Sequence, residues 1–236
     1  MSKSHAVIVI IAAGISLAGC LESREPLAET SASGEEMLRQ TLRVKSDLSR
    51  GRRWELDWGV ASAYDTASEQ LIRRVRLPGA SFSAARESCL PDMLLSRSGA
   101  LIVSSNAQPS LWRVSPSRFE VERYDIELDS DNDKDFGFTG LAWGADENTL
   151  FAVSAATGTL WRLDLVSAKA SKIELSTPIR GACGLALAPS AGAERRLKTL
   201  VVTIGSTKVS QRISLSPDLA RGEVRDARAT ELAAVK

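Results

Sequence analysis

The sequence predicts an all-β domain built from repeated antiparallel sheets, and three observations support that prediction. Short apolar runs rich in Val, Leu, Ile and Thr are separated by turn signals along most of the chain, which is typical of half-buried strands. The segment 136–175 holds four such runs in series. Two of these runs also have matching runs at one fixed separation, which indicates a repeated unit.

The clearest unit is the segment 136–175, which divides into four runs at 141–143, 149–154, 159–165 and 171–175. The first two runs are apolar, and a Gly-Ala-Asp-Glu-Asn turn separates them. The last two alternate apolar and charged residues, as strands with one buried face do. We therefore predict a four-stranded meander. Such a sheet cannot bury both of its faces alone, so it needs neighbouring sheets of the same kind.

The same unit recurs on both sides. The run at 101–104 precedes that at 150–153 by 49 residues, and Leu-Trp-Arg-Val at 111–114 precedes Leu-Trp-Arg-Leu at 160–163 by the same 49 residues. Weaker copies of the strands stand at 183–189, 198–204, 59–65 and 71–77. A period of this length with short, β-rich runs favours propeller blades over helical repeats.

These copies amount to three nearly full blades and one partial blade, so we predict a small or incomplete β-propeller of about four four-stranded blades. Three arrangements stay open: a four-bladed ring, an open arc, or half of a propeller completed as a homodimer. Trp112 and Trp161 occupy equivalent positions in two copies, which predicts repeated packing between blades rather than a ligand cage.

Two stretches carry a resemblance to known repeats, GVASAYDTASEQLIRRVRLPG at 59–79 and TLFAVSAATGTLWRLDL at 149–165. They resemble the repeats of YVTN-, NHL- and quinoprotein-type propellers, in which a strand ends at an acidic residue before a turn rich in Thr and Ser. The resemblance covers about residues 54–224 and is one of repeat style. Because such repeats serve enzymes and scaffolds alike, it implies a fold and not an activity.

Residues 1–19 have the pattern of a targeting segment. Lys3 precedes an apolar run at 6–13, which is shorter than the roughly 20 residues that span a bilayer. The sequence Leu-Ala-Gly-Cys that ends at Cys20 resembles the lipobox of bacterial lipoproteins. This resemblance implies cleavage before Cys20, its acylation, and anchoring in the lipid bilayer. Leu21 in place of Asp implies the periplasmic face of the outer membrane. The alternative is an ordinary signal peptide with a chance cysteine.

Residues 20–50 are predicted to be the lipidated N-terminus and a polar tether, followed by the propeller domain at 51–236. Ser33 and Glu36 have the spacing of a capping box. Apolar and Thr side chains after them would share one helix face, at Met37, Leu38, Thr41 and Leu42. We therefore expect a short helix within the tether.

The amino-acid composition limits the kinds of partner and reaction that the mature chain can support. Removing residues 1–19 leaves 29 basic and 29 acidic side chains, and this balance argues against a nucleic-acid partner. It also removes His5, the only histidine. A mature chain without imidazole has no Ser-His-Asp triad and no His-based metal site. Carboxylate chemistry is the remaining route to an enzyme.

Four carboxylates at alternate positions form the best candidate for a metal site: Asp129, Asp131, Asp133 and Asp135. Alternate carboxylates are how calcium loops collect oxygen ligands. Compared with an EF-hand loop, however, Lys134 stands in the place of the required Gly and Gly140 in that of the closing Glu. The alternatives are a weak calcium site that pins the loop and a solvated acidic loop between two blades.

Phe136 and Phe138 follow this loop and flank Gly137. They are candidates for an exposed aromatic binding anchor, the alternative being two phenylalanines that face the core. Cys89 and Cys183 remain after Cys20 is assigned to lipidation, and both precede the first strand of a predicted blade. They form a disulfide if the oxidising periplasm and the geometry allow it, or else stay as two unreactive thiols.

The sequence therefore predicts a membrane-anchored periplasmic lipoprotein that acts as a non-catalytic protein-binding scaffold. Its partner would be a periplasmic or envelope protein, bound by loops held on rigid blades. The loop 129–138 is the predicted functional rim. The alternative is a carboxylate- or calcium-dependent small-molecule binder or enzyme that uses the propeller channel.

Overall fold

The fold is described by a computed structural model, which covers residues 40–84, 89–129, 136–144, 146–188, 199–205 and 209–227. These residues form four antiparallel meanders, each of four strands in sequence order. The first sheet contains one 3-10 turn, η1 (Leu48–Arg50), and four strands: β1 (Arg43–Asp47), β2 (Arg52–Asp57), β3 (Val60–Asp65) and β4 (Leu71–Arg76). Among the described residues, no helix is long and apolar enough to cross a bilayer.

The other three sheets repeat this plan. The second consists of β5 (Met93–Leu95), β6 (Leu101–Ser104), β7 (Ser110–Val114) and β8 (Val121–Asp125). The third consists of β10 (Gly140–Trp143), β11 (Thr149–Val153), β12 (Leu160–Asp164) and β13 (Lys169–Leu175). The fourth consists of β14 (Ala182–Leu187), β15 (Thr199–Ile204), β16 (Val209–Leu215) and β17 (Arg221–Asp226). A short strand, β9 (Glu127–Leu128), follows the second sheet.

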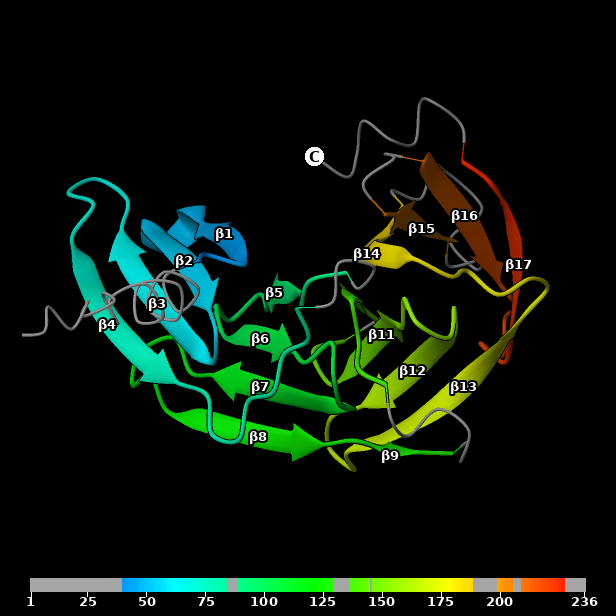
Figure 1. Ribbon diagram of the computed structural model, residues 1–236, viewed down its shortest axis with the longest axis horizontal. Coiled ribbons are helices and arrows are strands. Elements are labelled where there is room, and N and C mark those ends of the chain that lie inside the picture. Colours follow the sequence, from blue (N-terminus) through cyan, green and yellow to red (C-terminus); the bar gives the residue numbers. More distant parts are fainter. Residues whose placement is uncertain are drawn as a thin grey trace, which may run out of the picture.

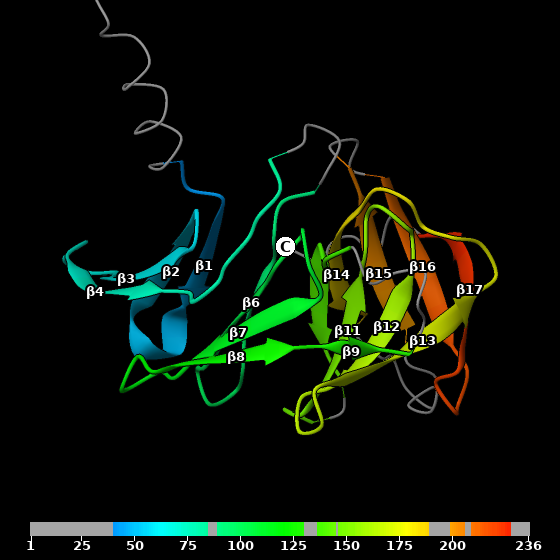
Figure 2. The ribbon, with the colours of Figure 1, turned by 60° about the horizontal axis from the view of Figure 1, so that its bottom comes forward.

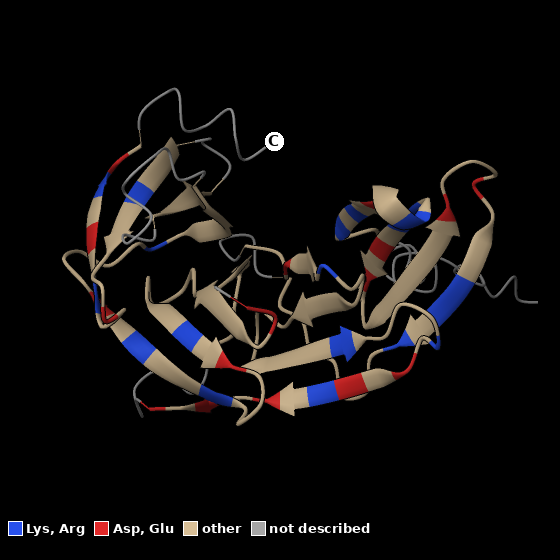
Figure 3. Cartoon of the chain, turned by 180° about the vertical axis from the view of Figure 1, so that it is seen from behind, with Lys and Arg blue, Asp and Glu red and all other residues tan. Residues whose placement is uncertain are grey.

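The sheets stand side by side in an arc, with the first strand of each sheet on the inside and the last on the outside (Figure 1). The outer strands connect neighbouring sheets: β13 pairs in parallel with β9 and with β17. Figure 2 shows β9 running beside β13. Lys and Arg alternate with Asp and Glu along the outer strands β8 and β17 (Figure 3). The outer edges of the second and fourth sheets are therefore charged.

The core fills the spaces between sheets. Trp54 and Trp112 are buried between the first and second sheets, Trp161 between the second and third, and Phe151 between the third and fourth. Each of these side chains is no more than 1% exposed. The equivalent tryptophans Trp112 and Trp161 thus pack between sheets. Burial of such large apolar side chains is the main driving force for the sheets to stack.

The repeat unit lies close to its predicted bounds. The runs at 141–143, 149–154, 159–165 and 171–175 correspond to β10, β11, β12 and β13. The first sheet is complete, whereas the sequence shows only its last two strands. Its first strand, β1, begins at Arg43, 8 residues before the predicted start of the domain at 51. The boundary between tether and domain was therefore predicted too late.

The helix expected in the tether is not seen where the structure describes that segment. Leu42 extends the ladder of β1 instead: its N–H donates to the carbonyl of Leu56 at 2.7 Å, and its side chain is buried. Thr41 lies in the same non-helical stretch. Met37, Leu38, the capping-box residues and Cys20 lie outside the described residues.

Candidate functional site

Loops at one end of the third and fourth sheets pack on one another and form what we call the upper rim, made of residues 136–139, 154–159 and 176–181. Ile179 N–H donates to Gly158 O, and Gly181 N–H donates to Ala155 O, both at 2.8 Å. Gly158 has φ +71°, and a Cβ there would lie 2.7 Å from the backbone N of Arg180. Only glycine allows this approach, so the β11–β12 loop is fixed against the segment that leads into β14.

A cavity of about 700 Å³ opens at this rim, and we call it the rim cavity. Ile173, Leu175 and Pro178 supply apolar lining, and Phe136 adds an aromatic ring that is 39% exposed. Polar and charged side chains complete the lining: Thr157, Thr159, Lys172, Glu174 and Arg180. The volume falls within the usual range of ligand sites, and the mixture of apolar walls and a few polar groups is typical of them.

The polar side chains of the rim cavity are held in different ways. Thr159 Oγ1 accepts the indole N–H of Trp161 at 2.9 Å and is 2.7 Å from Thr157 Oγ1. Lys172 Nζ lies 5.7 Å from the centre of the Trp161 ring. The exposed guanidinium of Arg180 has no hydrogen-bond or ion-pair partner among the described residues. Two cations against one carboxylate give the cavity a positive charge.

The two phenylalanines of the predicted aromatic anchor lie in different environments. Phe138 is 1% exposed and packs in the core between the second and third sheets, so it cannot contact an external partner. Its N–H donates to Ser105 O at 2.6 Å, and a Cβ on Gly137 would lie only 2.2 Å from that same oxygen. This close approach requires glycine at position 137, and the backbone bond holds Phe138 against Ser105. Phe136, outside it, lines the rim cavity.

The acidic loop can be followed only at its first residue. Both carboxylate oxygens of Asp129 accept the backbone N–H of Lys172, at 3.0 and 3.2 Å. Asp131, Asp133 and Asp135 lie outside the described residues. The predicted calcium site therefore stays a prediction. Within the described ranges, no group of three or more His, Cys, Asp and Glu side chains could hold a metal ion.

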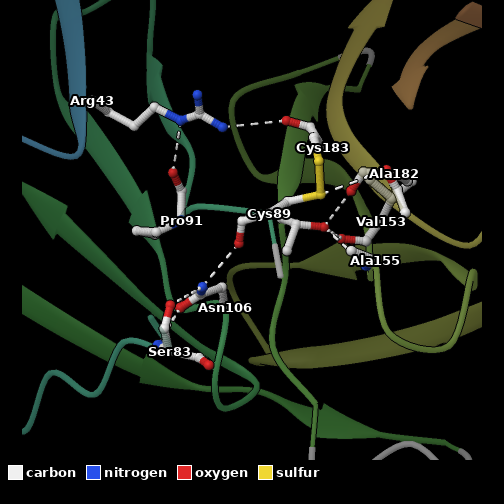
Figure 4. Close-up of a disulfide and its surroundings, with 11 residues drawn as sticks. Arg43, Ser83, Cys89, Pro91, Asn106, Val153, Ala155, Ala182 and Cys183 are labelled. Atoms are coloured by element: carbon white, nitrogen blue, oxygen red, sulfur yellow. Dashed lines mark hydrogen bonds between the residues drawn. A yellow bond between two sulfur atoms is a disulfide. The ribbon is translucent and has the colours of Figure 1, made fainter. Parts of the chain in front are cut away.

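Cys89 and Cys183 form a disulfide, with their Cα atoms 4.9 Å apart across a sequence separation of 94 residues (Figure 4). The bond links the segment before β5 to β14. Beside it, Arg43 of β1 donates from Nε to Pro91 O at 3.0 Å and from Nη2 to Cys183 O at 3.3 Å. The first, second and fourth sheets are thus tied together at the centre of the arc.

Thr139 adds a fourth connection at this centre. Its hydroxyl lies 2.6 Å from Ala182 O, to which it donates, and it accepts the N–H of Ala155 at 2.9 Å. The side chain is 3% exposed. The third sheet is therefore joined to the start of β14, and the upper rim is a structural support rather than a set of free loops.

A second cavity, of about 360 Å³, lies where the first strands of all four sheets converge, and we call it the inner cavity. Its lining includes Lys45 of β1, Asp92 and Leu94 at β5, Leu141 and Trp143 of β10, Gly184, Leu185, Ala186 and Leu187 of β14, and Thr203 of β15. It shares no lining residue with the rim cavity. A ligand there would contact every sheet at once.

Asp92 is the carboxylate of the inner cavity. Its Oδ2 accepts the N–H of Leu141 and its Oδ1 that of Met93, both at 2.8 Å. Burial raises the pKa of this carboxyl above its ordinary value, although the two N–H donors and the charges of Arg43 and Lys45 oppose the rise. No sequence pattern indicated Asp92, because Leu141, which donates to its Oδ2, lies 49 residues away in another sheet. Lys45 was missed because its strand was assigned to the tether.

Neither a family model nor a curated protein matches the sequence. Solved structures do match the fold. Hydrazine synthase of Kuenenia stuttgartiensis matches with a TM-score of 0.55 at 11% identity, over 81% of this chain and 50% of that chain. An auxiliary nutrient binding protein from Bacteroides thetaiotaomicron VPI-5482 matches with a TM-score of 0.50 at 10% identity, over 79% of this chain and 41% of that chain.

A third match, the Malassezia sympodialis allergen Mala s 1, has a TM-score of 0.44 at 13% identity, over 81% of this chain and 80% of that chain. The chain spans half or less of the length of the other two structures. Both have β-propeller-like folds, so the likeness shows a β-propeller-like all-β fold for this chain. At such low identity, it carries no function with it.

Proposed function

We propose that the protein is a lipoprotein of the periplasmic face of the outer membrane, anchored by acylated Cys20, and that it is a non-catalytic scaffold for a periplasmic or envelope protein. The β-propeller-like domain would be an incomplete propeller of about four blades that holds the upper rim rigid. The rim cavity would receive a segment of the partner protein.

The rim cavity is the observation that carries the proposal. It combines an exposed aromatic ring, an apolar wall and the guanidinium of Arg180, which has no partner within the described part of the chain. Buried aromatic and Arg contacts dominate the energy of protein interfaces. The loops around it are held by backbone hydrogen bonds, so little conformational entropy is lost when a partner binds. The Cys89–Cys183 disulfide supports an oxidising compartment such as the periplasm.

Site-specific photo-crosslinking tests the rim. A photoreactive phenylalanine analogue replaces Phe136 in the membrane-attached protein, and the control carries it at Val166. Val166 is 78% exposed and lies in the β12–β13 turn, at the opposite end of the same sheet. We expect one discrete crosslinked species from position 136, lost when Arg180→Glu is added, and none from position 166. Equal labelling at both positions would contradict a partner site at the rim.

The anchor has a separate test. Replacing Cys20 with Ser removes the acylated thiol, and acyl chains contribute about 0.8 kcal/mol per buried CH₂ to membrane binding. We expect the Cys20→Ser protein in the soluble periplasmic fraction and the unchanged protein in the membrane fraction. Retention of the variant in membranes would refute lipid anchoring without affecting the rim.

The alternative function is calcium-dependent binding of a small molecule. It is favoured by one observation only, that the start of the acidic loop is fixed at Asp129 beside the rim cavity. Calcium should then raise the melting temperature, and the Asp131→Asn/Asp133→Asn variant should lose that rise. No calcium-dependent change in the unchanged protein would remove this alternative.

A further inference from the structure

The inner cavity has the features of a second binding site, independent of the rim cavity. All four sheets contribute to it through β1, β5, β10, β14 and the neighbouring β15. Its volume of about 360 Å³ lies at the small end of the range of about 300–1,000 Å³ for ligand pockets. It is large enough for a small organic molecule and too small for a folded segment of a protein partner.

Most of its lining is apolar and held in place. Leu94 and Leu187 line the cavity with aliphatic side chains, and the side chain of Leu187 is 39% exposed. Leu141, also in the lining, packs its side chain in the core between the second and third sheets. Trp143 also lines the cavity, and its indole N–H donates to Leu95 O at 2.7 Å. This bond spans the second and third sheets and fixes the ring. A fixed indole beside aliphatic side chains suits an apolar or aromatic ligand body.

Lys45 supplies the positive charge of the cavity lining. It is exposed, lines the cavity, and has no hydrogen-bond or ion-pair partner among the described residues. Asp92 is the other ionisable residue of the lining, but both of its oxygens already accept backbone N–H groups. Its negative charge also interacts with the positive charges of Lys45 and Arg43. Two cations therefore face one carboxylate, and the net positive charge that remains attracts a ligand anion to the ammonium of Lys45. Thr203 offers a hydroxyl on the other side of the cavity.

The geometry points to a small amphipathic carboxylate as the ligand of the inner cavity. Its carboxylate pairs with Lys45, and its apolar body packs between Trp143 and the leucines. The charge on Lys45 steers the anion to the cavity, and the apolar walls provide most of the affinity. This site stands apart from the proposed protein contact at the rim and does not depend on it.

Calorimetric titration of the full chain carrying Cys20→Ser tests the inference with three probes. 3-Phenylpropionate has both the charge and the apolar body, its amide lacks the charge, and acetate lacks the body. We expect 3-phenylpropionate to bind at least tenfold more tightly than the amide, and acetate to give no signal. Equal binding of acid and amide, or no binding of the acid at millimolar concentration, would overturn the proposal.

Matched variants locate the site. Lys45→Met keeps the aliphatic stem but removes the charge, and should weaken 3-phenylpropionate binding at least tenfold. Leu187→Glu places a negative charge at a partly exposed wall and should abolish binding, with an unchanged circular dichroism spectrum showing that the variant is folded. Lys172→Met, in the rim cavity, should leave binding unchanged. Loss of binding in Lys172→Met but not in Lys45→Met would overturn the assignment to the inner cavity.

Discussion

The Oδ2 atom of Asp92 accepts the backbone N–H of Leu141 at 2.8 Å, and this bond joins the first strand of the second sheet to that of the third. The backbone of Asp92 is held in turn by Ser104: its N–H donates to Ser104 Oγ at 2.9 Å, and its carbonyl accepts the N–H of Ser104 at 3.0 Å. Asp92, at the start of β5, is thus linked to β10 through its side chain and to β6 through its backbone.

Replacing Asp92 with Ala should therefore destabilise the domain. The N–H groups of Leu141 and Met93 lose their acceptor at a poorly hydrated site, and such a loss costs about 1–3 kcal/mol per group. Urea denaturation gives the free energy of unfolding. Asp65→Ala is the control, because Asp65 accepts N–H groups of Ala67 and Ser68 in an exposed turn, where water replaces it. An equal loss in both variants would contradict the role given to Asp92.

The same carboxyl should give stability a recognisable pH dependence. Burial raises the pKa of Asp92 in the folded state, so the folded protein binds this proton more tightly than the unfolded chain does. The contribution of Asp92 to the free energy of unfolding must therefore rise as the pH falls from neutral through the raised pKa, and it is complete below the ordinary pKa of the unfolded chain. Asp92→Asn does not titrate, so the unchanged protein should gain stability relative to it in acid.

Denaturation of both proteins between about pH 7 and pH 4 measures that difference, and the other carboxyls cancel in it. Asp65 supplies a control of opposite sign. The N–H of Ser68 lowers the pKa of Asp65 below its ordinary value, so its contribution to stability is lost only below about pH 4. When the measurements are continued into that range, the unchanged protein should lose stability relative to Asp65→Asn. A pH-independent difference for Asp92→Asn would show that burial does not govern its titration.

The Cys89–Cys183 bond should make a large contribution to stability. It closes a loop of 94 residues, and the chain-entropy model gives about 4–5 kcal/mol for a loop of that length. The Cys89→Ala/Cys183→Ala variant should lose a stability of this order in urea denaturation. Reductant should destabilise the unchanged protein to the same extent and leave the double variant unaffected. An effect below about 1 kcal/mol would mean that Arg43 and Thr139 alone hold the centre of the arc.

The sequence predicted those structural features that show a local pattern of apolar and polar residues, and missed those that do not. Strands β11 and β12 were located to within a residue or so, because each alternates or buries apolar residues between clear turns. Strand β1 was missed because three of its five side chains, at 44–46, are exposed, so its sequence RVKSD shows no apolar pattern. Strand β1 borders the inner cavity instead of packing between two sheets. Its sequence therefore lacks the alternation of apolar and polar residues that a half-buried strand shows.

The cavities could not be predicted for a related reason. Lys45, Asp92 and Trp143 meet only after three sheets have packed, and no spacing in the sequence connects them. Phe136 and Phe138 could not be told apart by pattern alone. The structure places Phe136 in the lining of the rim cavity and Phe138 in the core, and a binding role for Phe136 stays a prediction. The close contact of Gly137 with Ser105 O, which lies far away in the sequence, fixes the backbone between the two rings. The disulfide between Cys89 and Cys183 could not be predicted either, because it depends on the distance between their Cα atoms, which the sequence does not contain.

Thr139 provides a test of the upper rim. Thr139→Val keeps the shape of the side chain but leaves the Ala155 N–H and the Ala182 carbonyl without their partner. Because the site is 3% exposed, water does not replace the hydroxyl, and we expect a loss of about 1–3 kcal/mol in the free energy of unfolding. Thr139→Ser should recover most of that loss. A Thr66→Val control on an exposed turn should change little, and a neutral Thr139→Val would show that the rim does not depend on this bond.

The two end faces of the arc predict a monomer. On the outward face of the first sheet, Arg53 pairs with Glu55 and lies over the ring of Tyr64, opposite the buried face that carries Trp54. On the outward face of the fourth sheet, Arg212 lies across from Arg225, which pairs with Glu223. A homodimer that completed a ring would bury these charges, and burying charges costs more than their pairing returns unless every group is satisfied.

Multi-angle light scattering of the Cys20→Ser protein should accordingly give the mass of one chain at micromolar concentration, unchanged on tenfold dilution. Arg53→Leu/Arg225→Leu removes one charge from each end face and should increase any tendency to associate. A difference in mass between the proteins with and without these two substitutions therefore measures the effect of the end-face charges on association. A stable dimer of the Cys20→Ser protein that resists dilution would contradict the prediction, and it would mean that the arc is half of a larger ring.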